Sequence, residues 1–276
     1  MVSYYVDPVE GVDGELPRGT ARNQPWKTVR WASEKIRQAH PVSQAGVELN
    51  LRAGVLHPSS VFDQLKGTAK QPLVIQPYGG DTITFDGSEP ALREPGAWTA
   101  VPGRANEWVS AEFTTAKDDR IALGRMTGTR QLLIAYSELD DLRATNESYV
   151  VTPLSDPRPA FGRVRDAHGN LTQTKVPFVY MGPGTQFEWL NAEHTRGRVH
   201  LRLAPTHFNA PGIQDYPGGT DPATVAVARN SGMAANFGTV ENAIVRNAVF
   251  QNGGRTTLGV QPEARNASFI SGHTSR

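Results

Sequence analysis

Apolar and polar residues alternate in short runs along most of the chain, as they do in strands with one buried face. Residues 47–52 read Val-Glu-Leu-Asn-Leu-Arg, which places three branched apolar residues on one face and three polar residues on the other. Two further runs, 73–76 and 82–85, lie on either side of a Tyr-Gly-Gly-Asp turn. This pattern predicts an all-β fold built from short strands.

Helical spacing is clear in only one segment, between Trp26 and Ala39. Apolar residues recur there every three or four positions, and Pro25 precedes the first turn. Because the exposed edge of a sheet invites other chains to pair with it, a helix ahead of many short strands favours a protective role. We therefore expect this helix to cover the first open end of a coil of strands.

The pattern changes over residues 94–202, where strand-like runs are separated by long polar loops and three of the five tryptophans occur. These features predict an inserted β-rich, sandwich-like subdomain with antiparallel strands. The chain thereby divides into a cap with the first coils (1–93), the inserted subdomain (94–202) and a return to the coils (203–276).

The phrase Arg-Asn-Ala-x-Phe begins at Arg246 and returns nineteen residues later at Arg265. In a parallel coil each turn stacks on the last at about 4.8 Å, so equivalent side chains lie over one another. We expect asparagine at the corners, where it tolerates a left-handed backbone, with phenylalanine inside and arginine facing solvent. The predicted stacked pairs are Asn247 with Asn266, Phe250 with Phe269, and Arg246 with Arg265.

Several motifs together resemble the opening of right-handed parallel β-helix proteins of the pectate-lyase-like superfamily. They are YYVDP, NQPWKTVRWASEKI, VELNLRAG and GTAKQPLVIQPYGGDTITFDGS, and the tail NAIVRNAVFQNGG is similar to the coils of that family. The middle of the chain resembles a segment inserted after the first coils in glycoside-hydrolase-like branches. The resemblance implies a right-handed parallel β-helix (solenoid) with an N-terminal capping helix. Family members usually continue for many more turns, so it also implies an N-terminal portion of a longer protein.

Composition excludes several classes of function. The formal net charge of the 276 residues is +1 and no basic block stands out, so a nucleic-acid partner is not expected. Cysteine is absent, which excludes disulfides and cysteine-bound zinc. The sequence contains no apolar run of about 18 residues, so no membrane span is predicted. The seven histidines show no metal-binding spacing, so no metal is expected, although calcium would suit a lyase. The protein is expected to be secreted or periplasmic if a signal peptide was removed; otherwise its location, like its oligomeric state, is open.

Sugar-cleaving chemistry on this kind of fold needs groups that converge on one groove. Polar residues around the predicted strand 257–261 and the two repeated arginines could face such a groove, or they could be solvated residues of an outer face. The substrate-binding candidates are Arg246, Arg255, Gln261, Glu263 and Arg265, and no catalytic residue is assigned. The acidic stretch 137–144 is interpreted as a polar turn or helix start rather than a pair of catalytic carboxylates.

The resemblance implies a carbohydrate-active protein, and a glycoside hydrolase acting on an extended polysaccharide or oligosaccharide is the first hypothesis. All six lysines precede the last coils, so the base of a lyase there would have to be arginine. A polysaccharide lyase acting on uronate-containing glycans is the alternative enzyme. A glycan-binding or spike-like solenoid without activity is the alternative from another class, because a solenoid offers a long face to a polymer whether or not it cuts it.

Overall fold

The computed structural model describes residues 1–126, 133–143, 164–165, 171–172, 180, 182–205, 216–254, 256–262, 264–270 and 273–274. The chain divides into two compact units, the first formed by residues 1–90 and 227–276 and the second by residues 91–226. The boundaries inferred from the sequence, at 93 and 202, stay predictions. In the described part of the chain no helix has the length and apolar character needed to cross a membrane.

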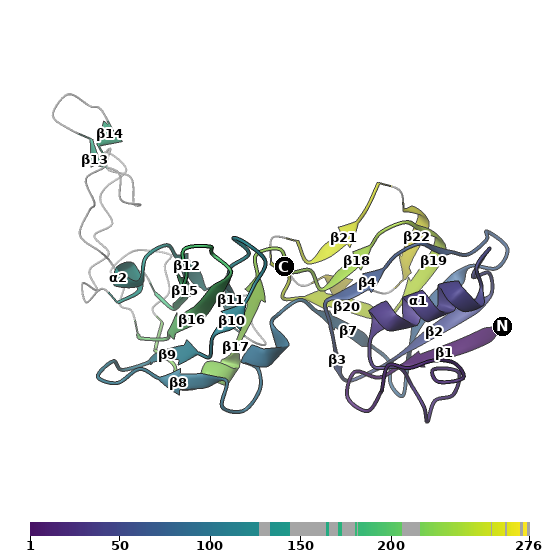
Figure 1. The fold of residues 1–276 in the computed structure, drawn as a ribbon, viewed down its shortest axis with the longest axis horizontal. Helices are drawn as coiled ribbons and strands as arrows, with labels where there is room; N and C mark the ends of the chain where they lie inside the picture. The colour runs from purple at the N-terminus through teal and green to yellow at the C-terminus, as the bar shows by residue number, and fades with distance from the viewer. Residues whose placement is uncertain are drawn as a thin grey trace. The chain divides into compact units, whose positions relative to one another are not determined.

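Three parallel sheets form the first unit (Figure 1). The first sheet has the order β1 (Val2–Val6), β2 (Val47–Arg52), β6 (Leu73–Tyr78), β19 (Val240–Arg246) and β22 (Arg265–Ile270), with β5 (Leu65–Lys66) also on β19. The second has the order β3 (Leu56–Pro58), β7 (Ile83–Asp86), β20 (Ala248–Gln251) and β23 (His273–Thr274). The third has the order β4 (Ser60–Phe62), β18 (Ala235–Phe237) and β21 (Leu258–Val260). Along the chain, strands of the first, second and third sheets follow one another, so the backbone curls around one shared interior.

Stacked side chains of like kind fill that interior. Leu49 pairs with Ile75 and Ile75 with Val245 in the register of the first sheet, and all three are buried. The ring of Phe85 stacks on that of Phe250 with centroids 5.1 Å apart, and similar stacking occurs between the third-sheet strands. The alternation seen in residues 47–52 is thereby confirmed, since its apolar residues face this core.

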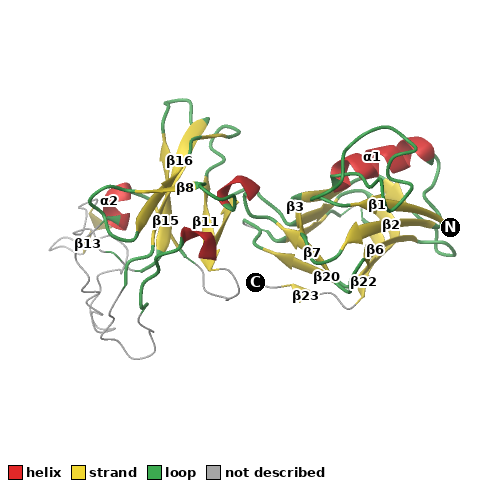
Figure 2. Ribbon diagram, turned by 90° about the horizontal axis from the view of Figure 1, so that it is seen from below, coloured by secondary structure: helices red, strands yellow, loops and turns green. Residues whose placement is uncertain are grey.

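Helix α1 (Val29–Ala39) is the segment that the apolar spacing predicted. Thr28 caps it, because its hydroxyl accepts a hydrogen bond from the Trp31 backbone N–H. The buried face of the helix, which includes Ala32 and Ile36, joins the same core as Trp26. The helix packs against β4 and against β1 (Figure 2), so it covers part of the shared interior.

The predicted stacking of the Arg-Asn-Ala-x-Phe repeat is wrong. Phe269 lies opposite Val245, and Asn266 donates a hydrogen bond to Asn242 Oδ1, 24 positions earlier, rather than lying over Asn247. Phe250 belongs to the second sheet and stacks on Phe85. One coil is therefore longer than the nineteen residues that separate the two copies of the phrase. The two copies accordingly occupy different corners of the coil. The backbone part of the prediction holds, because Asn247 and Asn266 both have left-handed φ angles, 50° and 53°.

His57 provides a prediction about acid stability. It is buried opposite Phe85, its Nε2 lies 2.8 Å from the Arg52 carbonyl, and burial lowers the pKa of its imidazole below the usual 6.5. The unfolded chain then binds a proton that the folded chain does not, so stability is full above about pH 6.5 and falls as the pH drops. We expect His57→Leu to flatten the dependence of the unfolding free energy on pH between about 7 and 5. Urea unfolding at several pH values tests this, and equal slopes in both proteins would contradict it.

The second unit is built around one mixed sheet. Its order is β12 (Ile134–Tyr136), β15 (Gly184–Trp189), β16 (Arg196–Arg202), β9 (Glu107–Ser110) and β8 (Trp98–Ala100), with β10 (Phe113–Thr114) also on β16. The smaller elements are β11 (Ile121–Met126), α2 (Leu139–Leu142), β13 (Val164–Arg165) paired with β14 (Leu171–Thr172), and η2 (Pro222–Thr224). Two further elements, η1 (Pro90–Leu92) and β17 (Val225–Arg229), which pairs with β11, contain residues of both units. Apart from the parallel pair β12–β15, the strands of the main sheet are antiparallel, as the sequence predicted.

Candidate functional site

A row of polar side chains crosses the outer face of the first sheet. Tyr5, Asn50 and Gln76 are aligned on three neighbouring strands, and Arg246 on the fourth strand reaches Gln76. Gln76 Nε2 donates to Asn50 Oδ1 at 3.1 Å, and Arg246 Nη1 donates to Gln76 Oε1 at 3.2 Å. We call these four residues the outer row; Asn50 is buried, whereas the other three keep exposed surface. Because parallel strands keep the same register, the row is held at fixed spacing by the sheet itself.

An aromatic pair lies at one end of the outer row. The rings of Tyr5 and Tyr78 meet edge to face, with centroids 5.4 Å apart and planes at 89°. The Arg22 guanidinium lies 5.0 Å from the centroid of the Tyr78 ring, and burial raises the pKa of the Tyr78 phenol. Both tyrosines keep part of their surface exposed, so each offers an apolar ring beside a hydroxyl group.

The charges beside the tyrosines are already balanced within the chain. Arg52 Nη1 lies 2.7 Å from Asp7 and 3.2 Å from Glu10. Burial alone would raise the pKa of Asp7, but backbone N–H groups and Arg52 together hold it below its usual value, so this carboxylate is ionised at neutral pH. Arg246, in contrast, is exposed and donates to a neutral amide. Together with the exposed Arg22 beside the aromatic pair, it is a cation of this face that a ligand could meet.

Three of the five predicted binding residues lie in the described part of the chain, on or next to different strands, and the prediction of a shared site stays a prediction. Arg246 lies in the outer row, and Arg265 is exposed on β22 opposite Glu241 rather than over Arg246, which corrects the predicted pairing of like charges. Gln261 is exposed at the end of β21, in the third sheet. Arg255 and Glu263 lie outside the described residues.

Sequence reasoning missed Tyr5, Gln76 and Tyr78. The run at 73–76 was expected to end before Tyr78, whereas β6 continues through Pro77 to that residue. Extending the alternation by one more pair would have placed Gln76 and Tyr78 on the same face as Asn50. The signal was present, but the proline concealed it, since proline usually disfavours a strand interior.

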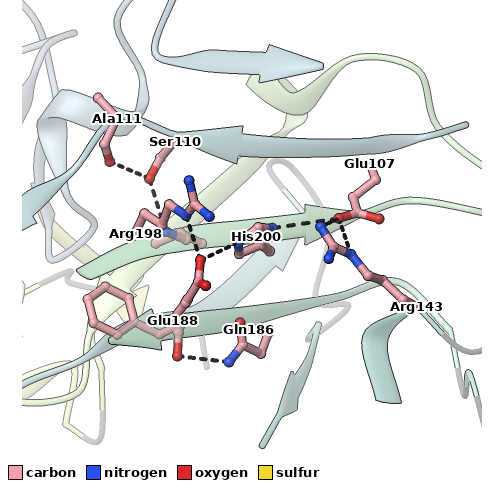
Figure 3. Close-up of polar contacts among 10 residues, drawn as sticks. Glu107, Ser110, Ala111, Arg143, Gln186, Glu188, Arg198 and His200 are labelled. Atoms are coloured by element: carbon pink, nitrogen blue, oxygen red, sulfur yellow. Dashed lines mark hydrogen bonds and ion pairs between the residues drawn. The ribbon is translucent and has the colours of Figure 1, made fainter. Parts of the chain in front are cut away.

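A second cluster of charged side chains surrounds His200 in the second unit (Figure 3). The imidazole is buried on β16, with its Nε2 3.1 Å from Glu188 Oε2 and its Nδ1 3.6 Å from Glu107 Oε1. Glu107 is also buried and lies 2.7 Å from Arg143 Nη2, while Arg198 Nε lies 2.5 Å from Glu188. Along this line each carboxylate contacts an arginine on one side and the imidazole on the other.

Both carboxylates of the His200 cluster are ionised at neutral pH. Burial would raise the pKa of Glu107, but His200 and Arg143 together hold it below its usual value. Burial would also raise the pKa of Glu188, but Arg198 and His200 hold it below its usual value. Hydrolysis of a glycoside needs one carboxylic acid that is still protonated beside a carboxylate. The cluster therefore has the properties of a structural charge network rather than of a hydrolase acid–base pair.

The remaining acidic candidates are structural in the part of the chain that the structure describes. Asp140 and Asp141 lie in the first turn of α2, as the helix-start interpretation of that stretch expected. Asp86 is buried at the end of β7 and accepts hydrogen bonds from Ser88. Within the described ranges no three His, Asp or Glu side chains gather in a way that could hold a metal ion. The calcium site that a lyase would use stays a prediction.

No protein-family model matches the chain, and a search of curated proteins finds no match. The chain is similar to parts of three solved structures. A complex of XylC with xylose is 15% identical, with a TM-score of 0.46 over 89% of this chain and 35% of that one. A GH136 lacto-N-biosidase from Eubacterium ramulus is 11% identical, with a TM-score of 0.33 over 92% of this chain and 20% of that one. A structure described as a glycoside hydrolase is 12% identical, with a TM-score of 0.38 over 92% of this chain and 51% of that one. The chain spans between a fifth and about half of their lengths, so the evidence for a function comes from its own side chains.

Proposed function

We propose that this is a carbohydrate-active protein that binds an extended polysaccharide or oligosaccharide along the outer row and the adjacent tyrosines. The observation that carries the proposal is the combination of groups at fixed spacing on one sheet face. Tyrosine rings can pack against the apolar faces of sugar rings, while the guanidinium of Arg246, held in place by Gln76, can bond their hydroxyl groups. A flat row across parallel strands suits a polymer better than a small molecule.

We propose further that the three parallel sheets are the faces of a right-handed β-helix of the pectate-lyase-like kind. The parallel register of all the strands and the order in which the chain visits the sheets support this. Glycoside hydrolysis stays a proposal for the activity, and lyase chemistry on uronates stays an alternative. The hydroxyl of Ser3 donates to Glu48, and Lys66 forms an ion pair with Glu241. Because both of these carboxylates already have a partner, the geometry of this sheet favours binding over acid–base catalysis.

Glycan titrations test the proposal. We expect saturable binding of a neutral or uronate-containing hexasaccharide, followed by calorimetry, and about tenfold weaker binding in Tyr78→Ala and in Arg246→Ala, which is about 1.4 kcal/mol. Arg120→Ala removes an exposed arginine in the second unit and should leave the affinity unchanged. The proposal would be contradicted if neither class of hexasaccharide bound. It would also be contradicted if the wild type and the three variants bound with equal affinity. A clear preference for the neutral glycan that does not depend on calcium would in addition exclude the lyase alternative.

A further inference from the structure

A groove separate from the outer row lies beside the C-terminal half of α1. Its volume is about 740 Å³, and residues of α1, of the turn after it and of the segment around β5 line it. Small-molecule sites in proteins usually enclose about 300–1,000 Å³, so the groove has the size of a site for a mono- or disaccharide. All of its lining residues belong to the first unit.

Arg37 and Gln64 are held together in the wall of this groove. Arg37 Nη1 donates to Gln64 Oε1 at 2.7 Å, which fixes the amide oxygen and leaves the amide N–H₂ of Gln64 as a donor. Gln64 has a φ of 53°, a left-handed conformation that non-glycine residues rarely adopt and that often marks functional positions. Arg37 Nε is shielded from solvent and has no hydrogen-bond partner. A donor left in this state is costly in a folded protein unless something else satisfies it.

Two cations and one carboxylate are among the side chains that line the groove. Lys66 adds a second cation whose Nζ lies 3.3 Å from Glu241, with about half of its side chain exposed. The amide of Gln44 is already used on both sides, because it donates to the His40 carbonyl and accepts from the Lys66 backbone N–H. Glu34 is the carboxylate that lines the groove, and it accepts from Gln38. A ligand here should therefore supply acceptors, and a carboxylate matches a guanidinium and an ammonium best.

We propose that this groove binds a sugar acid, with its carboxylate on Arg37 and Lys66 and its ring against Val42. Val42 is 91% exposed on the groove's rim, next to Pro41, and offers an apolar surface to one face of the ring. The inference that the ligand is a sugar rests on the proposed function. The inference that it carries a carboxylate rests on the donors of the groove itself. The outer row takes no part in the site.

Binding of glucuronate, measured by calorimetry or by amide shifts in NMR, tests the proposal. We expect saturable binding of glucuronate, none of glucose at the same concentrations, and at least about tenfold weaker binding of glucuronate in Arg37→Gln. Lys66→Met should weaken binding in the same direction, so a failure of one variant to fold leaves a second test. Arg30→Gln removes an arginine of the same helix that does not line the groove and should leave binding unchanged.

Two comparisons separate this site from the outer row. Tyr78→Ala should bind glucuronate as the wild type does, even if it no longer binds hexasaccharides. Three results would each overturn the proposal that the groove is a binding site. They are loss of glucuronate binding in Tyr78→Ala, equal glucuronate binding in Arg37→Gln and wild type, and glucuronate binding that does not saturate. Acetate that binds as tightly as glucuronate would overturn the assignment to a sugar acid.

Discussion

Replacing Phe250 by alanine is expected to lower the free energy of unfolding by about 3–5 kcal/mol. The ring is 2% exposed and stacks on Phe85 within the shared interior, where neighbouring coils hold the cavity walls apart and limit their collapse. Removing the ring therefore loses both its burial and its contacts with three other phenylalanines, Phe85, Phe237 and Phe269. Equilibrium unfolding in guanidinium chloride measures the change.

Phe269 provides a matched control for Phe250 within the same repeated phrase. It occupies the equivalent position of the second copy, but 37% of it is exposed, on the last described strand of the first sheet. Phe269→Ala should therefore cost clearly less than Phe250→Ala. A cost for Phe250→Ala below about 0.5 kcal/mol, as is typical of surface positions, would contradict the interior placement of this ring.

Replacing Glu107 by alanine is expected to destabilise the protein by about 3–5 kcal/mol, which is the usual result of removing one partner from a buried charge network. The substitution leaves His200 buried without its second carboxylate and Arg143 without its ion-pair partner. Tryptophan fluorescence during urea unfolding at pH 7 follows the change, since Trp108 is the residue directly after Glu107 in β9.

Two further variants separate charge from packing in the His200 cluster. Glu188 is the other carboxylate on His200 but 32% of its side chain is exposed, so water can replace it and Glu188→Ala should cost about 1 kcal/mol or less. Replacing both members of the buried pair, Glu107→Leu with Arg143→Met, should recover part of the loss seen in Glu107→Ala, because fewer buried charges are left without a partner. Equal losses for Glu107→Ala and Glu188→Ala would show that burial does not set the energy of this network.

The local pattern of the sequence determined the elements whose signals are local. The apolar spacing of residues 26–39 predicted α1, and the alternation of 47–52 predicted which residues of β2 face the interior. Both follow from the periods of helix and strand, which depend only on neighbouring residues. The same reasoning predicted the left-handed corners at Asn247 and Asn266, because backbone preference is a property of the residue itself.

The tertiary structure alone decided which residues meet from one coil to the next. The repeated phrase indicated a spacing of nineteen residues, but a coil must also pass through three strands and their corners, so Asn266 meets Asn242 instead. The outer row and the His200 cluster depend on the same kind of register, since Gln76 and Arg246, like Glu107 and His200, come from distant parts of the chain. A sequence shows which residues can occupy a strand face, but the pairing of strands sets which of them become neighbours.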